Sequence, residues 1–426
     1  MKFYLLQASV LALALAVPAT GQSQKVSPPK TVYWMSAATQ SGFGMGSAPS
    51  TSDMMRMAMG GGGSSVIKTL NLDLGSKLPP SPAPGAADHA VPPGMNMGAN
   101  LPLRAPKKGT PSQGTEEFER PKGKLLLFWG CGETAKPGQP VVFDFARIAA
   151  GEMPANLFGG ERVRLQRPPN ASTWPTYVYW PNTDKQNGSR QVPSNASLVG
   201  PHKVTGNFAP QMDFSLQQDW MQGVNMKQQK NASGSVGLQW NVVPGATAHF
   251  AQMVAGRDEG GAPVIVFWAS SETQTFFSGM SDFISPSEAS RLVGKKLLMP
   301  PSQTSCAIPK EAVAAAKDAG LILLTSHGPE QNIVYPPRPK DPKVDWVQEW
   351  SVKARFVSRT GAIIGMEDMG GAGGATASGK PKCKPDAATE AGKAAGGGIG
   401  GSVGRAMGGA LGGLMGKKKP KEDCEP

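Results

Sequence analysis

Two matching apolar runs constrain the fold of this chain more than any other feature of its sequence. LLLFWGCGET lies at residues 125–134 and VIVFWASSET at residues 264–273, and a weaker echo, TVYWMSAATQ, lies at residues 31–40. Short apolar runs that end in Gly, Ser or Thr are typical of buried β-strands. The repetition predicts a β-rich scaffold in which the tryptophans of the three runs are equivalent core anchors, namely Trp34, Trp129 and Trp268.

Two glutamates, Glu133 and Glu272, occupy matching places in the two stronger runs. A pair of carboxylates at a suitable separation performs general acid–base catalysis in many hydrolases. In these runs, however, the tryptophans are expected to pack inward and both glutamates to face water. The third run has Ala38 at the equivalent position. The sequence therefore predicts no catalytic residue, no cofactor and no enzymatic activity, and a hydrolase built on the paired glutamates is the less favoured interpretation.

The rest of the chain alternates strand-like segments with stretches rich in Gly and Pro, which number 54 and 39 among the 426 residues. This pattern predicts a mainly β protein of two antiparallel β-sandwich units, with short helical insertions and disordered extensions. The predicted organisation is a signal peptide at 1–21, N-terminal strands with a Gly/Met-rich loop at 22–75, a Pro-rich linker at 76–123, a first β unit at 124–201, a second β-sandwich at 202–369 with a helical insertion at 285–320, and a Gly/Lys-rich tail at 370–426.

The first residues have the features of a secretion signal. Lys2 provides a positive charge, residues 5–17 form an apolar core that is short for a membrane span, and small residues follow at 18–21. We therefore expect an exported protein, located in the periplasm, at the outer membrane or outside the cell. Its formal charge of +12 favours anionic neighbours, and we expect no nucleic-acid partner for an exported chain.

The four cysteines of the chain are expected to form disulfides in an oxidising compartment. They are Cys131, Cys306, Cys383 and Cys424, and four cysteines allow three pairings. We favour Cys131 with Cys306, because both lie in strand-like sequence, and Cys383 with Cys424, because both lie in the tail. No Cys or His spacing suggests a zinc site.

The passage LQWNVVPGATAHF at residues 238–250 places a Trp before a Pro/Gly/Ala turn and an aromatic strand. In this respect the stretch of about 230–275 resembles the B–C strand region of fibronectin type III domains, although His249 stands where that family usually has Tyr. The resemblance implies an antiparallel β-sandwich of the fibronectin III or immunoglobulin type and implies no catalytic activity. The YWMS, FWGCGE and VPGATA passages are similar to those of exported proteins of Gram-negative bacteria.

A period of four residues dominates the tail. Glycines recur at Gly396, Gly400, Gly404, Gly408 and Gly412, and basic residues follow at Lys417, Lys418 and Lys419. On a helix such glycines form a GxxxG ridge that favours close packing against a membrane helix or a partner. The lysines would be attracted to an anionic membrane surface. A flexible tail remains the alternative, because each glycine costs a helix about 1 kcal/mol in water.

Two further clusters are candidate binding sites. Thioethers suit Cu(I), so the methionine cluster of the N-terminal loop is a candidate soft-metal site, or alternatively an adaptable contact surface; its residues are Met54, Met55, Met57 and Met59. The WPTYVYWPN passage is a candidate glycan site, because aromatic rings stack on sugar rings, while ordinary core packing is its alternative; its residues are Trp174, Tyr177, Tyr179 and Trp180.

We therefore expect a non-enzymatic exported envelope protein that binds or scaffolds through the surfaces of its β-sandwich. Its partner would be an envelope protein or a glycan, with an anionic membrane surface as a possible contact of the tail. Handling of Cu(I) in the periplasm by the Met-rich loops is the alternative function.

Overall fold

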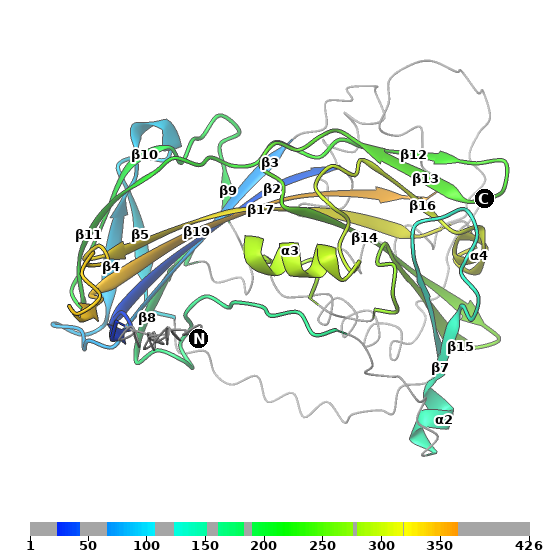
Figure 1. The fold of residues 1–426 in the computed structure, drawn as a ribbon, viewed down its shortest axis with the longest axis horizontal. Coiled ribbons are helices and arrows are strands. Elements are labelled where there is room, and N and C mark those ends of the chain that lie inside the picture. Colours follow the sequence, from blue (N-terminus) through cyan, green and yellow to red (C-terminus); the bar gives the residue numbers. More distant parts are fainter. Residues whose placement is uncertain are drawn as a thin grey trace, which may run out of the picture.

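A computed structural model of the chain describes residues 24–42, 66–106, 123–150, 161–182, 190–275, 279–317 and 319–364. These residues form a mainly β structure, which confirms the predicted fold class at this level (Figure 1). Their helices are short: η1 (Pro93–Met95), α2 (Phe145–Ala149), α3 (Pro286–Gly294) and α4 (Lys310–Ala315). Helix α3 lies in the predicted helical insertion at 285–320. At its start the Ser285 hydroxyl accepts a hydrogen bond from the Glu288 amide, and Pro286 lies in the first turn.

Two sheets pack face to face in the C-terminal half of the described structure. The smaller sheet has the strand order β12 (Met226–Lys230), β13 (Val236–Trp240), β16 (Ser305–Ile308). It shares one apolar core with a run of four strands in the larger sheet, in the order β15 (Ala262–Ala269), β14 (Ala248–Glu259), β17 (Leu321–Tyr335), β19 (Trp350–Ile363). The chain crosses from β13 to β14 at Gly245, whose φ of +77° suits glycine.

One strand pairs in parallel with each edge of this four-stranded run, and antiparallel pairs extend the sheet further. Beyond β15 lie β6 (Lys124–Trp129) and β7 (Val141–Asp144). Beyond β19 lie β2 (Thr31–Gly42), β3 (Ile67–Ser76), β8 (Thr176–Trp180), β5 (Asn100–Arg104), β4 (Ala86–Ala90), β10 (Gly200–Gly206) and β11 (Ala209–Leu216), and β9 (Arg190–Val192) also pairs with β3. In Figure 1 the blue β2 runs beside the orange β19. The short strands β1 (Val26–Ser27) and β18 (Trp346–Val347) pair separately.

The large sheet therefore contains strands from both of the units that the sequence predicted. Strands β6 and β8 belong to residues 124–201, while β14, β15, β17 and β19 belong to residues 202–369. The parallel pairing of β6 with β15 joins the two stretches edge to edge. The boundary at residue 201 consequently does not separate two sheets.

The large sheet curls so that its edge strand β11 returns to the β17–β19 hairpin. The side-chain amide of Gln331 closes this seam, because its Nε2 donates to the Ser215 carbonyl (2.8 Å) and its Oε1 accepts from the Gln217 amide (3.0 Å). The inner face of the curl is apolar, and its largest fully buried side chains include Tyr33, Met35, Leu70, Leu72 and Leu74. On the outer face, near β14, β15 and β6, a second apolar cluster packs against α3.

One disulfide links the segment after β6 in the large sheet to β16 in the smaller sheet. Cys131, which follows β6, is bonded to Cys306 in β16, with their Cα atoms 5.0 Å apart. This pair is the predicted one. The backbone supports the same junction, because the Gly132 amide donates to the Ala307 carbonyl at 3.0 Å. The second predicted pair, Cys383 with Cys424, lies outside the described residues.

The repeated runs pair with each other, but with a shift of one residue. Phe128 lies opposite Trp268 in the parallel β6–β15 pair, and Trp129 lies opposite Ala269. Because side chains alternate between faces, the shift turns Trp129 to the outer face, where it is half-buried, while Trp268 is fully buried inside. Trp34 is also half-buried on the outer face. The prediction that the three tryptophans are equivalent core anchors is therefore wrong.

A chain of buried hydrogen bonds crosses the inside of the curl. The Leu198 carbonyl can only accept, so Nε2 of His202 donates to it (2.7 Å) and Nδ1 of His202 accepts from Nε2 of His89 (2.9 Å). Nδ1 of His89 then accepts the hydroxyl proton of Tyr33 (2.8 Å). Every group in this chain is satisfied while both imidazoles are neutral, and burial lowers the pKa of both histidines accordingly.

All four histidines of the chain are buried, and burial lowers the pKa of each, so the protein is predicted to lose stability in mild acid. The unfolded chain protonates histidines below about pH 6.5, whereas the folded state does so only at lower pH, so stability falls as the pH falls. Each histidine contributes up to about 2 kcal/mol of this loss between pH 7 and pH 5. The raised pKa values of Asp73 and Asp282 act in the opposite direction and offset part of it.

Urea unfolding of the mature protein at pH 7, 6 and 5 measures this effect. We expect the free energy of unfolding to fall steeply over that range. A value that stays constant or increases toward pH 5 would contradict the neutral histidine chain.

Candidate functional site

Aromatic and charged side chains line the outer face of the large sheet between β8 and β19. One row crosses four neighbouring strands, with Tyr179 opposite Asp73, Asp73 opposite Trp34, and Trp34 opposite Lys353. Because side chains alternate along a strand, Tyr177 of β8 and both Arg355 and Arg359 of β19 lie on the same face as this row. We call this surface the aromatic–basic face and define it by Trp34, Asp73, Tyr177, Tyr179, Lys353, Arg355 and Arg359.

Two tyrosines form the aromatic end of this face. The rings of Tyr177 and Tyr179 are parallel, with an interplanar angle of 3° and centroids 5.9 Å apart, and both side chains are half-buried. The Tyr177 hydroxyl donates to Oδ1 of Asp73 at 2.7 Å. Burial raises the pKa of Asp73 to about 6, although the Tyr177 hydrogen bond and the Arg355 charge both lower it. Asp73 is therefore an ionised acceptor at neutral pH.

The two tryptophans of the predicted glycan site have different positions. Trp180 lies on the inner face, only 4% exposed, because it is one residue out of phase with the two tyrosines. Trp174 is half-buried and lies over Gly75, which is opposite Tyr177. A Cβ on Gly75 would lie 2.7 Å from the Trp174 ring, so only glycine permits this contact. The structure thus brings together three of the four predicted residues.

Two arginines of β19 form the basic end of the face. Arg355 donates from Nε to the Ser36 hydroxyl (2.8 Å) and from Nη1 to the Gln166 carbonyl (3.1 Å). Arg359 donates from Nη2 to the Ser281 carbonyl (2.9 Å). The ring of Phe283 contacts both guanidinium carbons, with its centroid 4.3 Å from that of Arg355 and 5.3 Å from that of Arg359.

Lys353 completes the basic end and differs from the arginines in having an ion-pair partner. Its ammonium lies 2.9 Å from the Glu330 carboxylate and also donates to Oε1 of Gln166 at 2.6 Å. It lies over the Trp34 ring, 5.1 Å from the centroid, and the Arg355 guanidinium lies 5.0 Å from the same ring. The Trp34 ring therefore already makes cation–π contacts with both Lys353 and Arg355.

A small cavity borders the basic end. It has a volume of about 290 Å³ and is lined by Arg164, Leu165, Gln166, Ser285, Ser287, Glu288 and Arg291. Within it, the Glu288 carboxylate is hydrogen-bonded to Arg291 and to the Arg164 amide. Since Gln166 also contacts Lys353 and Arg355, the segment that contains it connects this cavity to the aromatic–basic face.

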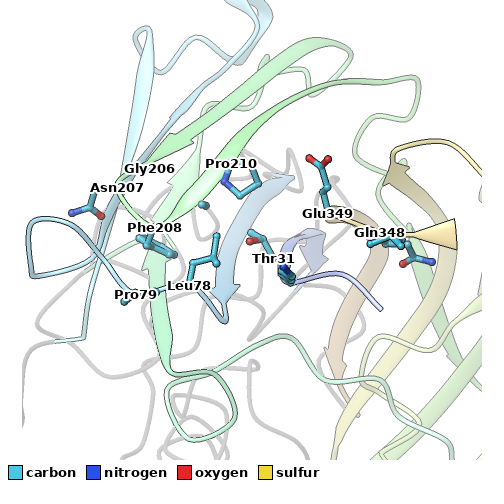
Figure 2. Close-up of a pocket in the computed structure, with 12 residues that line it drawn as sticks. Thr31, Leu78, Pro79, Gly206, Asn207, Phe208, Pro210, Gln348 and Glu349 are labelled. Carbon is cyan, nitrogen blue, oxygen red and sulfur yellow. The ribbon is translucent and has the colours of Figure 1, made fainter. Parts of the chain in front are cut away.

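A larger groove, of about 510 Å³, lies at one end of the curled sheet (Figure 2). Leu78, Phe208 and Pro210 contribute apolar surface, and Gln348 and Glu349 lie across from them. Two polar side chains of the groove already have hydrogen-bond partners within the protein. The Thr31 hydroxyl is hydrogen-bonded to the Ser76 hydroxyl, and the Asn207 side-chain amide is hydrogen-bonded to the backbone of Ala86 and Pro84. The groove therefore offers fewer recognition groups than the aromatic–basic face.

The remaining sequence-predicted sites do not join this face. Glu272 binds Lys136 and the Cys131 amide, and the Glu133 side chain is exposed. Within the described ranges, no three His, Cys, Asp or Glu side chains could hold a metal ion. The described helices include none with the length and hydropathy of a membrane span.

Other predicted site residues lie outside the described residues. They are the methionines Met54, Met55, Met57 and Met59, the glycines Gly396, Gly400, Gly404, Gly408 and Gly412, and the lysines Lys417, Lys418 and Lys419.

Sequence reasoning missed the basic end of the face. Its only local signal is that Lys353, Arg355 and Arg359 occupy odd positions of a strand whose even positions are Val352, Ala354 and Phe356. That alternation marks one solvated face of a strand. It does not indicate that residues from four distant segments meet there, because such pairing is not encoded locally.

Comparison with known proteins provides no family for this chain. No family model matches the sequence, and no curated protein is similar to it at a significant level. Its function is therefore inferred from the geometry of the aromatic–basic face.

Proposed function

We propose that this chain is a non-enzymatic exported protein of the bacterial envelope, and that it binds a glycan on the aromatic–basic face. The observation that carries the proposal is the pair of parallel, half-buried tyrosines, one of which donates a hydrogen bond to the Asp73 carboxyl group. Flat aromatic rings complement the C–H faces of sugars, and fixed acceptors and donors select their hydroxyl groups. Tyr177 and Tyr179 lie on the same face of β8, and Asp73 lies opposite Tyr179 on β3, so the three residues provide this combination.

The position of these rings also supports binding. Aromatic side chains on a sheet face are usually covered by another layer of structure, and those that stay half-exposed beside polar groups are typical of recognition surfaces. The inner face of the same strand contains the core residues Val178 and Trp180, so the tyrosines are not needed to fill that core.

We further infer that residues 226–363 form a sandwich of the fibronectin type III kind. The order β12-β13-β16 opposite β15-β14-β17-β19 supports this type, as does the buried Trp240 before the crossing to β14. His249 takes the place of the usual Tyr and bonds the Ser326 hydroxyl at 2.9 Å. The curled part of the sheet from β2 to β11 would then be the second unit.

The Cys131–Cys306 disulfide supports an exported location, because disulfides persist in oxidising compartments. Contact of the basic tail with anionic membranes stays a prediction, as does Cu(I) binding by the Met-rich loop. An envelope protein as the partner, in place of a glycan, would use the same aromatic–basic face.

A glycan array followed by calorimetry tests the proposed function. We expect binding to a bacterial envelope polysaccharide, and a loss of about 3- to 10-fold in affinity for Tyr179→Ala, because an aromatic contact contributes about 0.5–1.5 kcal/mol. Tyr335→Ala is the matched control, since Tyr335 is exposed and stacks on Trp350 away from this face. An array without binding, or equal losses in both variants, would contradict the proposal.

The Tyr177 hydrogen bond gives a second prediction. Tyr177→Phe removes the only hydroxyl that the described residues donate to Asp73, so the pKa of this carboxyl should rise above about 6. Carboxyl-detected NMR titration measures it, with Tyr179→Phe as the control that leaves the bond intact. A pKa that stays unchanged or falls in Tyr177→Phe would show that the hydrogen bond does not stabilise the carboxylate.

A further inference from the structure

Two arginines of the aromatic–basic face are buried without a direct ion-pair partner. Arg355 is 8% exposed and Arg359 is 5% exposed. Within the described part of the chain, neither guanidinium lies within 4.0 Å of a carboxylate oxygen. Taking a guanidinium out of water costs several kcal/mol unless an anion compensates its charge. The burial of both groups on one strand therefore requires an explanation.

The carboxylates that face these arginines are few and already engaged. Asp73 accepts from Tyr177, and Glu330 is paired with Lys353. Asp282 interacts electrostatically with both arginines without reaching ion-pairing distance. Both arginines stay charged at neutral pH, because burial lowers the pKa of each only to about 10.

The two groups also have unused hydrogen-bond donors. Nη2 of Arg355 makes no hydrogen bond within the described residues, and Nε of Arg359 is buried without a partner. Ser281 accepts the Arg359 hydrogen bond at its backbone carbonyl, and its side-chain hydroxyl is also buried without a partner. Phe283 contacts both guanidinium groups and limits the access of water to them. Buried polar groups are normally satisfied, so the unpartnered Nε of Arg359 and the unpartnered Ser281 hydroxyl indicate a missing acceptor.

A purely structural role explains only part of this arrangement. The Arg359 bond to the Ser281 carbonyl and the Arg355 bonds to Ser36 and Gln166 fix neighbouring segments. These bonds leave Nη2 of Arg355, Nε of Arg359 and the Ser281 hydroxyl without acceptors. An anionic group with several oxygens accepts from several such donors at once, and guanidinium groups bind carboxylates and phosphates in this way.

We propose that Arg355, Arg359 and Ser281 form an anion-binding subsite of the aromatic–basic face, and that its ligand is an acidic group borne by a glycan. This inference rests on the proposed function and narrows it to acidic saccharides. The tyrosines contact the sugar ring, Asp73 accepts from a hydroxyl group, and Arg355, which is electrostatically coupled to Asp73, binds the acid. A carboxylate, a phosphate or a sulfate on the sugar meets this requirement.

Calorimetry with a uronic acid oligosaccharide and its carboxyl-reduced neutral counterpart tests the subsite. We expect the acidic form to bind the mature protein about 10- to 100-fold more tightly, because hydrogen bonds between charged groups are stronger than neutral ones. Arg355→Gln should remove this preference. Arg257→Gln should keep it, because Arg257 is an arginine of β14 that donates to the Ala315 carbonyl away from the face. Arg355→Lys, which keeps the charge, should retain part of the preference if Arg355→Gln does not fold.

Free sulfate and inorganic phosphate distinguish the source of the acid. If they stabilise the wild-type protein in thermal unfolding but not Arg355→Gln, while neither oligosaccharide binds, the anion subsite stands and the glycan function fails. If both oligosaccharides bind with equal affinity, the glycan function stands and the subsite is overturned. If no oligosaccharide binds and neither free anion stabilises the protein, both are overturned.

Discussion

The parallel pairing of β2 with β19 is the constraint on which the rest of this structure depends. It runs in register from Thr31 opposite Trp350 to Gly42 opposite Gly361, and it attaches the N-terminal strand to the edge of the sandwich. Because the register is fixed over this length, Ser36 lies beside Arg355 and Trp34 beside Lys353. A shift of one residue would turn these side chains to the apolar inner face. The aromatic–basic face exists only in this register.

Two buried polar networks lie on opposite faces of β2, and they differ in how completely they are satisfied. The chain from Tyr33 through His89 and His202 to the Leu198 carbonyl has a partner for every donor and acceptor. The guanidinium groups of Arg355 and Arg359 keep donors that no described residue uses. A satisfied network rigidifies the interior, whereas incomplete satisfaction of a charged group is typical of sites that bind a ligand. The first network is therefore structural, and we assign the second to recognition.

The sequence predicted what local signals encode. The mainly β fold, the helical insertion at 285–320, the Pro/Gly/Ala turn at Gly245 and the Cys131–Cys306 disulfide follow from composition and short patterns. Register was not predictable, because the repeated runs pair with a one-residue shift that no local signal specifies. The aromatic half of the candidate site was predictable from the spacing of Tyr177 and Tyr179. The basic half was not, since Ser36, Gln166, Phe283 and Arg355 come from separate segments that only tertiary pairing unites.

A crystal structure of the mature protein with a bound acidic oligosaccharide tests the central claim most directly. We expect the acidic group to lie within hydrogen-bonding distance of Arg355, with a sugar ring against Tyr177 or Tyr179 and a hydroxyl on Asp73. A ligand that occupies the groove between Leu78 and Glu349 while the aromatic–basic face stays empty would contradict recognition on this face.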